Sequence, residues 1–213
     1  MKKLKPILLI IVSCVLLAAC DNSLERANNA VSLMQDKVGQ IVNGLYQIQD
    51  LENLLQEHFE SDLTNAGDDL TYFTKDEALV IQNVDQRKLA LETIEKALEE
   101  LEGLKPELAR IKEGSTLPTS DFGQINSMID NLAIDLKTYL ADYQTNLELE
   151  RQTYQSIGNP ETNYETFFQV FDNINILSET NLYNLDLVLK NFEPLNRLLV
   201  DTKIKIVTII DNQ

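Results

Sequence analysis

The chain has 213 residues, of which 34 are Asp or Glu and 18 are Lys or Arg, so its formal net charge at pH 7 is -16. This charge argues against nucleic acid and anionic lipid headgroups as partners, because binding to their phosphates relies on Lys and Arg. Apolar residues make up 44% of the chain, which excludes a disordered tail, and the length suits one domain with its own core.

Residues 1–19 have the layout of a secretory signal peptide. Three lysines among the first five residues precede an apolar run from Ile7 to Ala19, which only Ser13 and Cys14 interrupt. As a helix this run would span roughly 20 Å, well short of the roughly 30 Å hydrocarbon core of a bilayer. We therefore expect residues 1–19 to be removed on export, which leaves residues 20–213 as a single helical-bundle domain.

The end of this segment, Leu17-Ala18-Ala19-Cys20, resembles the lipobox of bacterial lipoproteins. The resemblance implies that Cys20 receives a diacylglyceryl group and becomes the first residue of the mature chain. Two acyl chains suffice for stable anchoring. We therefore expect the protein to be lipid-anchored through Cys20 at the extracellular face of the cell membrane. Cys14 is removed, so no disulfide framework is available.

Glycine and proline are scarce, with seven and five in the whole chain, which favours long helices. In the first two stretches, apolar residues recur at helical steps of three and four, which is typical of a packed helical seam. We expect Ser23 to cap the first helix and Thr74 to Glu77 to form a capping box for the second. Gly103 and Pro106 should kink the second helix or interrupt it.

Two further stretches follow the same period. The third begins at Ser120 or Asp121, and Gly158-Asn159-Pro160 should end it and start the fourth. The fourth is apolar over a broad arc, so we expect it to be the most enclosed helix and to pack against at least two neighbours. Pro194 should bend it, and residues 204–210 should form its helical end. The predicted fold is all-α: an elongated antiparallel bundle of three to four long helices with coiled-coil-like seams, preceded by a signal peptide.

Few residues offer chemistry. His58 is the only histidine and is flanked by Glu57 and Glu60, so we expect it to be an exposed residue at a helix end. A zinc site would need ligands that the chain lacks, and no E-x-x-H pair for a di-metal site occurs. Nor is there a phosphate-binding glycine motif or a nucleophile beside a histidine. We therefore expect no catalytic residues, no metal site and no cofactor.

Aromatic residues gather where the third and fourth stretches meet. Most of them lie on the seams and should pack in the core, with tyrosine hydroxyl groups reaching solvent. Phe167 and Phe168 are adjacent and cannot both face inward along a narrow stripe. Together with Tyr164 they form the candidate contact patch.

The whole chain resembles the YkyA-type cell-wall-binding lipoproteins of low-GC Gram-positive bacteria. The resemblance rests on short sequence segments: Asn83 to Lys88, Tyr139 to Tyr143, and Glu148 to Tyr154. It implies an extracellular, membrane-anchored, all-helical protein with a role in the cell envelope, and it supplies no catalytic residues. The mature chain keeps 15 basic and 34 acidic residues, a net charge of -19, so anionic wall polymers would be repelled unless cations bridge them or a neutral glycan or peptide is recognised.

The sequence therefore predicts a membrane-anchored lipoprotein that binds or scaffolds envelope components, with a cell-wall component or an envelope protein as its partner, and that is not an enzyme. One alternative is a lipoprotein that binds a solute or metal ion, which would need a concave pocket, whereas continuous seams predict a filled core. A second is a cryptic envelope hydrolase, which would need carboxylates brought together from separate helices.

Replacement of Cys20 tests the anchor. Without the thiol no lipid is attached, so we expect Cys20→Ala to appear in the medium, whereas the unaltered protein stays with the membrane fraction. Immunoblots of both fractions measure this. Retention of Cys20→Ala in the membrane fraction would contradict the anchor.

Overall fold

The structure is a computed structural model that describes residues 23–111 and 117–212. Cys20 and the predicted signal peptide lie outside these residues. The described elements are all helical: α1 (Ser23–Asn53), α2 (Leu55–Ala66), η3 (Leu70–Thr74), α3 (Leu79–Ala109), α4 (Thr119–Ile157), α5 (Tyr164–Leu189) and α6 (Phe192–Asp211). The predicted all-α class is confirmed.

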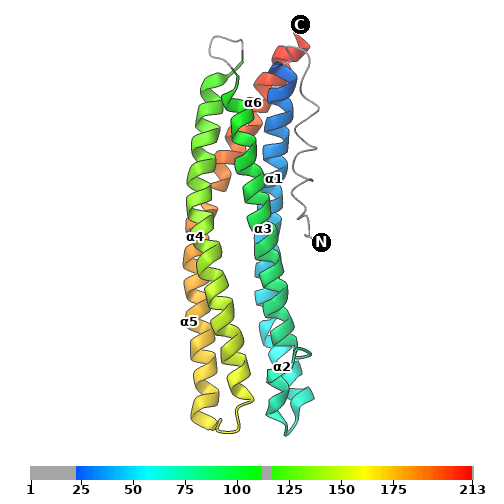
Figure 1. Ribbon diagram of the computed structural model, residues 1–213, viewed down its shortest axis with the longest axis vertical. Coiled ribbons are helices and arrows are strands. Elements are labelled where there is room, and N and C mark those ends of the chain that lie inside the picture. The colour runs from blue at the N-terminus through cyan, green and yellow to red at the C-terminus, as the bar shows by residue number, and fades with distance from the viewer. Residues whose placement is uncertain (1–22, 112–116, 213) are drawn as a thin grey trace, which may run out of the picture.

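The helices form an elongated antiparallel bundle (Figure 1). α4, with 39 residues, is about 58 Å long at 1.5 Å per residue. In the half that contains the start of α1, α6 packs against α1 and α4, and α3 completes a four-helix arrangement. In the other half, α2 continues the direction of α1, while α5 packs along α4.

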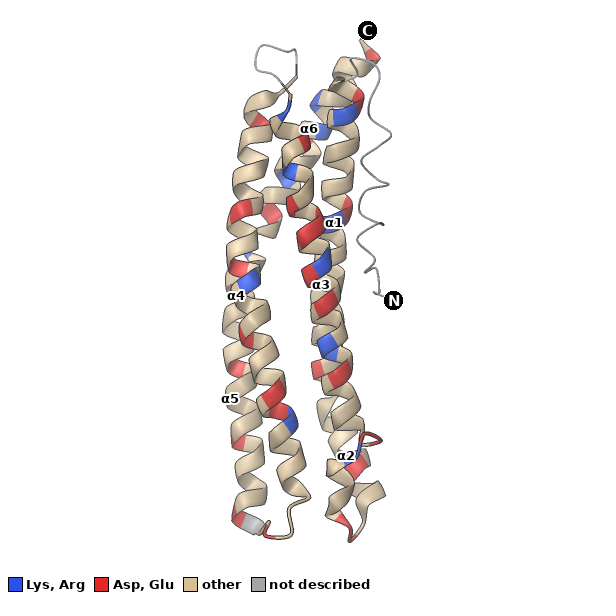
Figure 2. Ribbon diagram, in the orientation of Figure 1, with Lys and Arg blue, Asp and Glu red and all other residues tan. Residues whose placement is uncertain are grey.

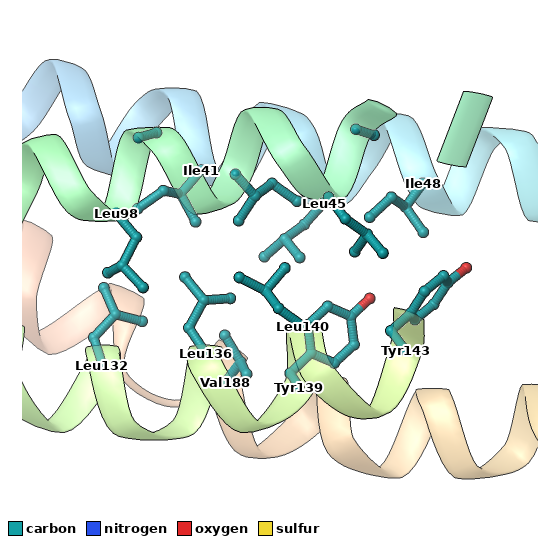
Figure 3. Close-up of a cluster of buried hydrophobic side chains, with 14 of the residues drawn as sticks. Ile41, Leu45, Ile48, Leu98, Leu132, Leu136, Tyr139, Leu140, Tyr143 and Val188 are labelled. Atoms are coloured by element: carbon teal, nitrogen blue, oxygen red, sulfur yellow. The ribbon is translucent and has the colours of Figure 1, made fainter. Parts of the chain in front are cut away.

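Helical periodicity produces one continuous core. The predicted third seam is buried along its whole length, and side chains of α4 meet those of α1 and α3 in the middle of the bundle (Figure 3). α1 and α3 approach closely at Gly44, where a Cβ atom would lie 2.5 Å from Cγ1 of Ile94. The buried residues of the third seam are Phe122, Ile125, Ile129, Leu132, Leu136, Tyr139, Tyr143, Leu147, Tyr154 and Ile157.

α5 differs from the prediction that the fourth stretch is the most enclosed helix. It packs along α4, and its contact with α6 is small. Its apolar arc is wider than the face that α4 covers, so much of the arc is exposed, and its only charged residues are acidic (Figure 2). The exposed apolar side chains on α5 are Phe168, Phe171, Ile176, Leu182, Tyr183, Leu187 and Leu189.

The predicted capping box at Thr74 to Glu77 is wrong. α3 begins later, at Leu79, and the carboxylate of Asp62 on α2 supplies its cap. The backbone N–H groups of Leu79 and Val80 donate to the two Asp62 oxygens, each at 2.9 Å. A carboxylate is favourable at a helix start because it satisfies free N–H groups and faces the positive end of the dipole.

The helix boundaries near proline also differ in part. α3 continues through Pro106, so of the kink or interruption predicted there, the interruption does not occur. α5 begins at a capping box between Asn163 and Thr166 instead of at Pro160. The fourth stretch breaks before Phe192, and Pro194 lies in the first turn of α6, where a missing N–H costs little. The prediction that residues 204–210 are helical is confirmed.

Replacement of Asp62 tests the cap. Asp62→Ala leaves two backbone donors at the start of α3 without an acceptor, so we expect the free energy of unfolding to fall by about 2 kcal/mol. Urea titration followed by circular dichroism measures it. Asp68→Ala, at an exposed position six residues further on, is the control and should change stability little. Equal losses in both variants would contradict the cap.

Candidate binding groove

A buried arginine lies inside the bundle near α2. Arg87 of α3 is 1% exposed, and each nitrogen of its guanidinium group has a partner. Its Nε donates to Oδ1 of Asn83 at 2.8 Å, and its Nη1 donates to the Tyr143 hydroxyl at 3.1 Å. Its Nη2 pairs with the carboxylate of Glu150, which is also buried. Burial is the largest single influence and lowers the pKa of Arg87, but the charges and hydrogen bonds of Glu150 and Tyr143 together outweigh it, so the pKa of Arg87 is raised.

A second carboxylate lies at the edge of this network. The Tyr143 hydroxyl donates to Oε1 of Glu52 at 2.6 Å, and the same oxygen is 3.9 Å from Nη1 of Arg87. The side chain of Glu52 is 29% exposed, so it reaches solvent, unlike that of Glu150. Burial raises the pKa of the Glu52 carboxyl, more than the Tyr143 hydrogen bond and the Arg87 charge lower it.

Helical spacing brings these groups together. Asn83 and Arg87 are four residues apart and therefore share one face of α3. On α4, Tyr143, Glu150 and Tyr154 follow steps of seven and four, which keeps them on one face. Because α3 packs against α4, the two faces meet in the core.

The network forms the floor of a groove between α1–α2 and α5. Its volume is about 640 Å³, and Arg87, Glu150 and Tyr154 line its floor, with Glu52 beside them. The α2 wall is mostly apolar, as is the first half of the α5 wall. Polar side chains line the remainder: the amide and hydroxyl groups of Asn53, Gln56, Asn175, Ser178 and Asn181, and the carboxylate of Glu60 on α2.

Apolar rings close one end of the groove. Phe59 of α2 contacts Phe171 of α5 edge to face, with ring centroids 5.1 Å apart. Phe167 also reaches Phe59, at 6.3 Å, and it is half-buried. These contacts join α2 to the first two turns of α5, and the groove opens beyond them.

The candidate contact patch lies beside this closed end. Phe168 is 49% exposed and packs edge to face on Phe167, with ring centroids 5.7 Å apart. The backbone of Tyr164 starts α5, but its side chain lies outside the described residues, as does Cys20.

The expectation that His58 is an exposed residue is wrong. It is half-buried, and its Nδ1 lies 3.3 Å from Nδ2 of Asn83, at the back of the arginine network.

The expectation of a filled core is also wrong where the groove lies. The sequence pattern that could have indicated this site is the charged residues at seam positions of α3 and α4. On α3, Val84 and Leu91 are seam residues seven positions apart, and Arg87 occupies the seam position between them. On α4, Glu150 occupies the same kind of position between Leu147 and Tyr154. Arg87 and Glu150 both lie in the short sequence segments on which the family resemblance rests. A charged residue at a seam position is buried, so each needs an opposite partner.

The residues that the structure describes offer no group of three or more His, Cys, Asp or Glu side chains that could hold a metal ion. Among the same residues, no helix is both apolar enough and long enough to cross a membrane.

Comparison with known proteins identifies one family. The sequence profile named YkyA, described as "Putative cell-wall binding lipoprotein", matches residues 22–187. This span includes α1 to α5 almost completely, and with them every side chain that lines the groove. No curated protein and no solved structure matches the chain.

Replacement of Glu52 tests the burial of its carboxylate. Because the pKa of Glu52 is raised in the folded state, the unfolded chain releases this proton first as the pH rises above about 4.5. The free energy of unfolding therefore falls as the pH rises from the pKa of the unfolded chain to that of the folded protein. Glu52→Gln cannot ionise and can still accept the Tyr143 hydroxyl. We therefore expect the stability of Glu52→Gln relative to the unaltered protein to increase between pH 4 and pH 7, measured by urea titration. A difference that stays constant or shrinks would contradict the burial.

Proposed function

The chain belongs to the YkyA family of cell-wall binding lipoproteins, and from that premise we propose that it binds a component of the cell envelope in the groove between α1–α2 and α5. In this proposal lipid on Cys20 holds it at the extracellular face of the membrane. It binds its partner without catalysing a reaction.

The groove is the observation that carries the proposal. Ligand sites are concave, mostly apolar and equipped with a few convergent polar groups, and their volumes fall between roughly 300 and 1,000 Å³. The groove has about 640 Å³, apolar walls and a polar floor held in place by Arg87. The Arg87 network orders this floor before any ligand binds, which lowers the entropic cost of binding.

The position of the groove supports an anchored protein. α1 begins at Ser23, three residues after the proposed lipid on Cys20, and Glu52 lies near its other end. At 1.5 Å per residue, the 29 steps between Ser23 and Glu52 correspond to about 45 Å. The helix would therefore hold the groove well away from the lipid surface, toward the wall.

The arrangement of acids supports binding over hydrolysis. Glycoside hydrolysis needs two carboxyl groups that flank the bond to be cut. Glu52 and Glu150 both reach the groove, but Glu150 is 3% exposed and held by Arg87. The groove residues on α5 include no Asp or Glu, so the two walls do not place acids on opposite sides of a ligand.

A lipoprotein that binds a free solute is the second candidate. The groove favours it because a volume of about 640 Å³ suits a small molecule as well as part of a polymer. The two functions differ in whether the ligand is attached to the wall.

Blocking the groove tests the proposal. Ser178 is exposed on the α5 wall, and we expect Ser178→Trp to fill the groove and reduce retention of residues 21–213 on purified wall sacculi at least fivefold. Ser127→Trp, at an exposed position on α4 away from the groove, should be retained like the unaltered protein. Co-sedimentation followed by gel densitometry measures retention.

Each other outcome is informative. Retention that is equal in all three proteins would place wall binding outside the groove. No retention of the unaltered protein would contradict wall binding, and a search for a soluble ligand by mass spectrometry would then test the second candidate.

A further inference from the structure

We propose that the ligand of this groove carries a protonated primary amine that pairs with Glu52, on a short peptide-like chain that lies between α2 and α5. This inference rests on the proposed function, because it names the chemistry that the same groove recognises.

The balance of charge at the floor leads to an amine. One buried cation, Arg87, faces two carboxylates, Glu150 and Glu52. The guanidinium donors are directed to Asn83, Tyr143 and Glu150. Within the part of the chain that the structure describes, Glu52 accepts a hydrogen bond only from Tyr143. Glu52 therefore holds the excess negative charge, at the place where the floor meets solvent.

A carboxylate in this position costs folding stability, since burial outweighs its favourable contacts. A bound cation would offset that cost, because two opposite charges at about 3 Å attract strongly where the effective dielectric constant is low. Glu60 also lines the groove, eight residues further along the same wall, and adds negative potential. The acidic residues that line the groove and the cost of burying the Glu52 charge both favour a positively charged ligand.

Anionic ligands do not fit the groove. Among the described residues that line it, Arg87 is the only basic one; it is 1% exposed, and its nitrogens already have partners. An anion would instead face Glu52 and Glu60. This excludes direct recognition of anionic wall polymers in the groove and agrees with the negative charge of the chain.

The groove also suits an organic amine better than a bare metal ion. No three acidic or histidine side chains converge among the described residues, while Leu55, Phe59 and Ile174 supply apolar surface on both walls. Amide side chains of Asn53 and Asn175 line the groove and can bond to a peptide backbone. An amine on a peptide meets the acidic, apolar and amide parts of the groove together.

A matched pair of peptides tests the inference. The probes are N-acetyl-Ala-Lys-Ala-amide and the same peptide with its lysine amine acetylated, titrated into residues 21–213 at 150 mM salt. Changes in the NMR signals of the protein report binding and its location. We expect signals of residues that line the groove to shift, and the affinity to fall at least tenfold on acetylation.

Two protein variants locate the pairing. Glu52→Gln should bind the peptide with the free amine at least tenfold more weakly. It should stay folded, because the glutamine side chain can still accept the hydrogen bond from the Tyr143 hydroxyl. Glu57→Gln removes the same charge from an exposed residue that does not line the groove, and it should bind like the unaltered protein. Equal affinity for both peptides, or equal effects of the two variants, would overturn the inference.

Acetylated sacculi separate this inference from the proposed function. Treatment of sacculi with acetic anhydride blocks their free amines, and we expect it to abolish retention of the unaltered protein. If blocked sacculi retain the protein while Ser178→Trp is released, the amine is wrong and wall binding through the groove stands. If the peptides bind through their amine but neither kind of sacculus retains the protein, the amine is right and wall binding is wrong.

Discussion

The burial of Arg87 is the constraint on which the α2 end of the bundle depends. A guanidinium group in the core must be paired on all sides, and removal of one partner of such a pair typically costs about 3 to 5 kcal/mol. α3, α4 and the end of α1 each contribute partners, so the network sets where these three helices lie relative to one another. The paired groups also form the floor of the groove, whose walls are α1–α2 and α5.

The sequence predicts the fold well because its strongest signal is local. In the third stretch the residues of the seam follow a helical period and each of them is buried in α4, whereas Ile134 and Leu149, which lie off the seam, are exposed. Where a contact from a distant element decides the structure, local reasoning fails. Thr74 and Glu77 have the pattern of a capping box, yet Asp62 takes that role, because the fold brings α2 against the start of α3.

The site was harder to predict than the fold. The pattern of apolar residues alone does not show that Arg87 and Glu150 are buried. Arg87 and Glu150 fit the period of their helices as well as the leucines beside them do, so the period predicts burial, and opposite charges predict pairing. The pocket itself could not be predicted, because it depends on how far α5 lies from α2, which no residue pattern specifies.

α5 packs mainly along α4, its contacts with α6 and with Phe59 of α2 are small, and its remaining apolar surface is exposed or lines the groove. A segment with so few buried contacts opens at lower free energy than the rest of the bundle. A molecule in the groove would touch α2 and α5 together, so it would add to the few ring contacts that join them. Under the proposed function, ligand binding would therefore be coupled to docking of α5, by the difference in ligand affinity between a docked and an undocked arrangement.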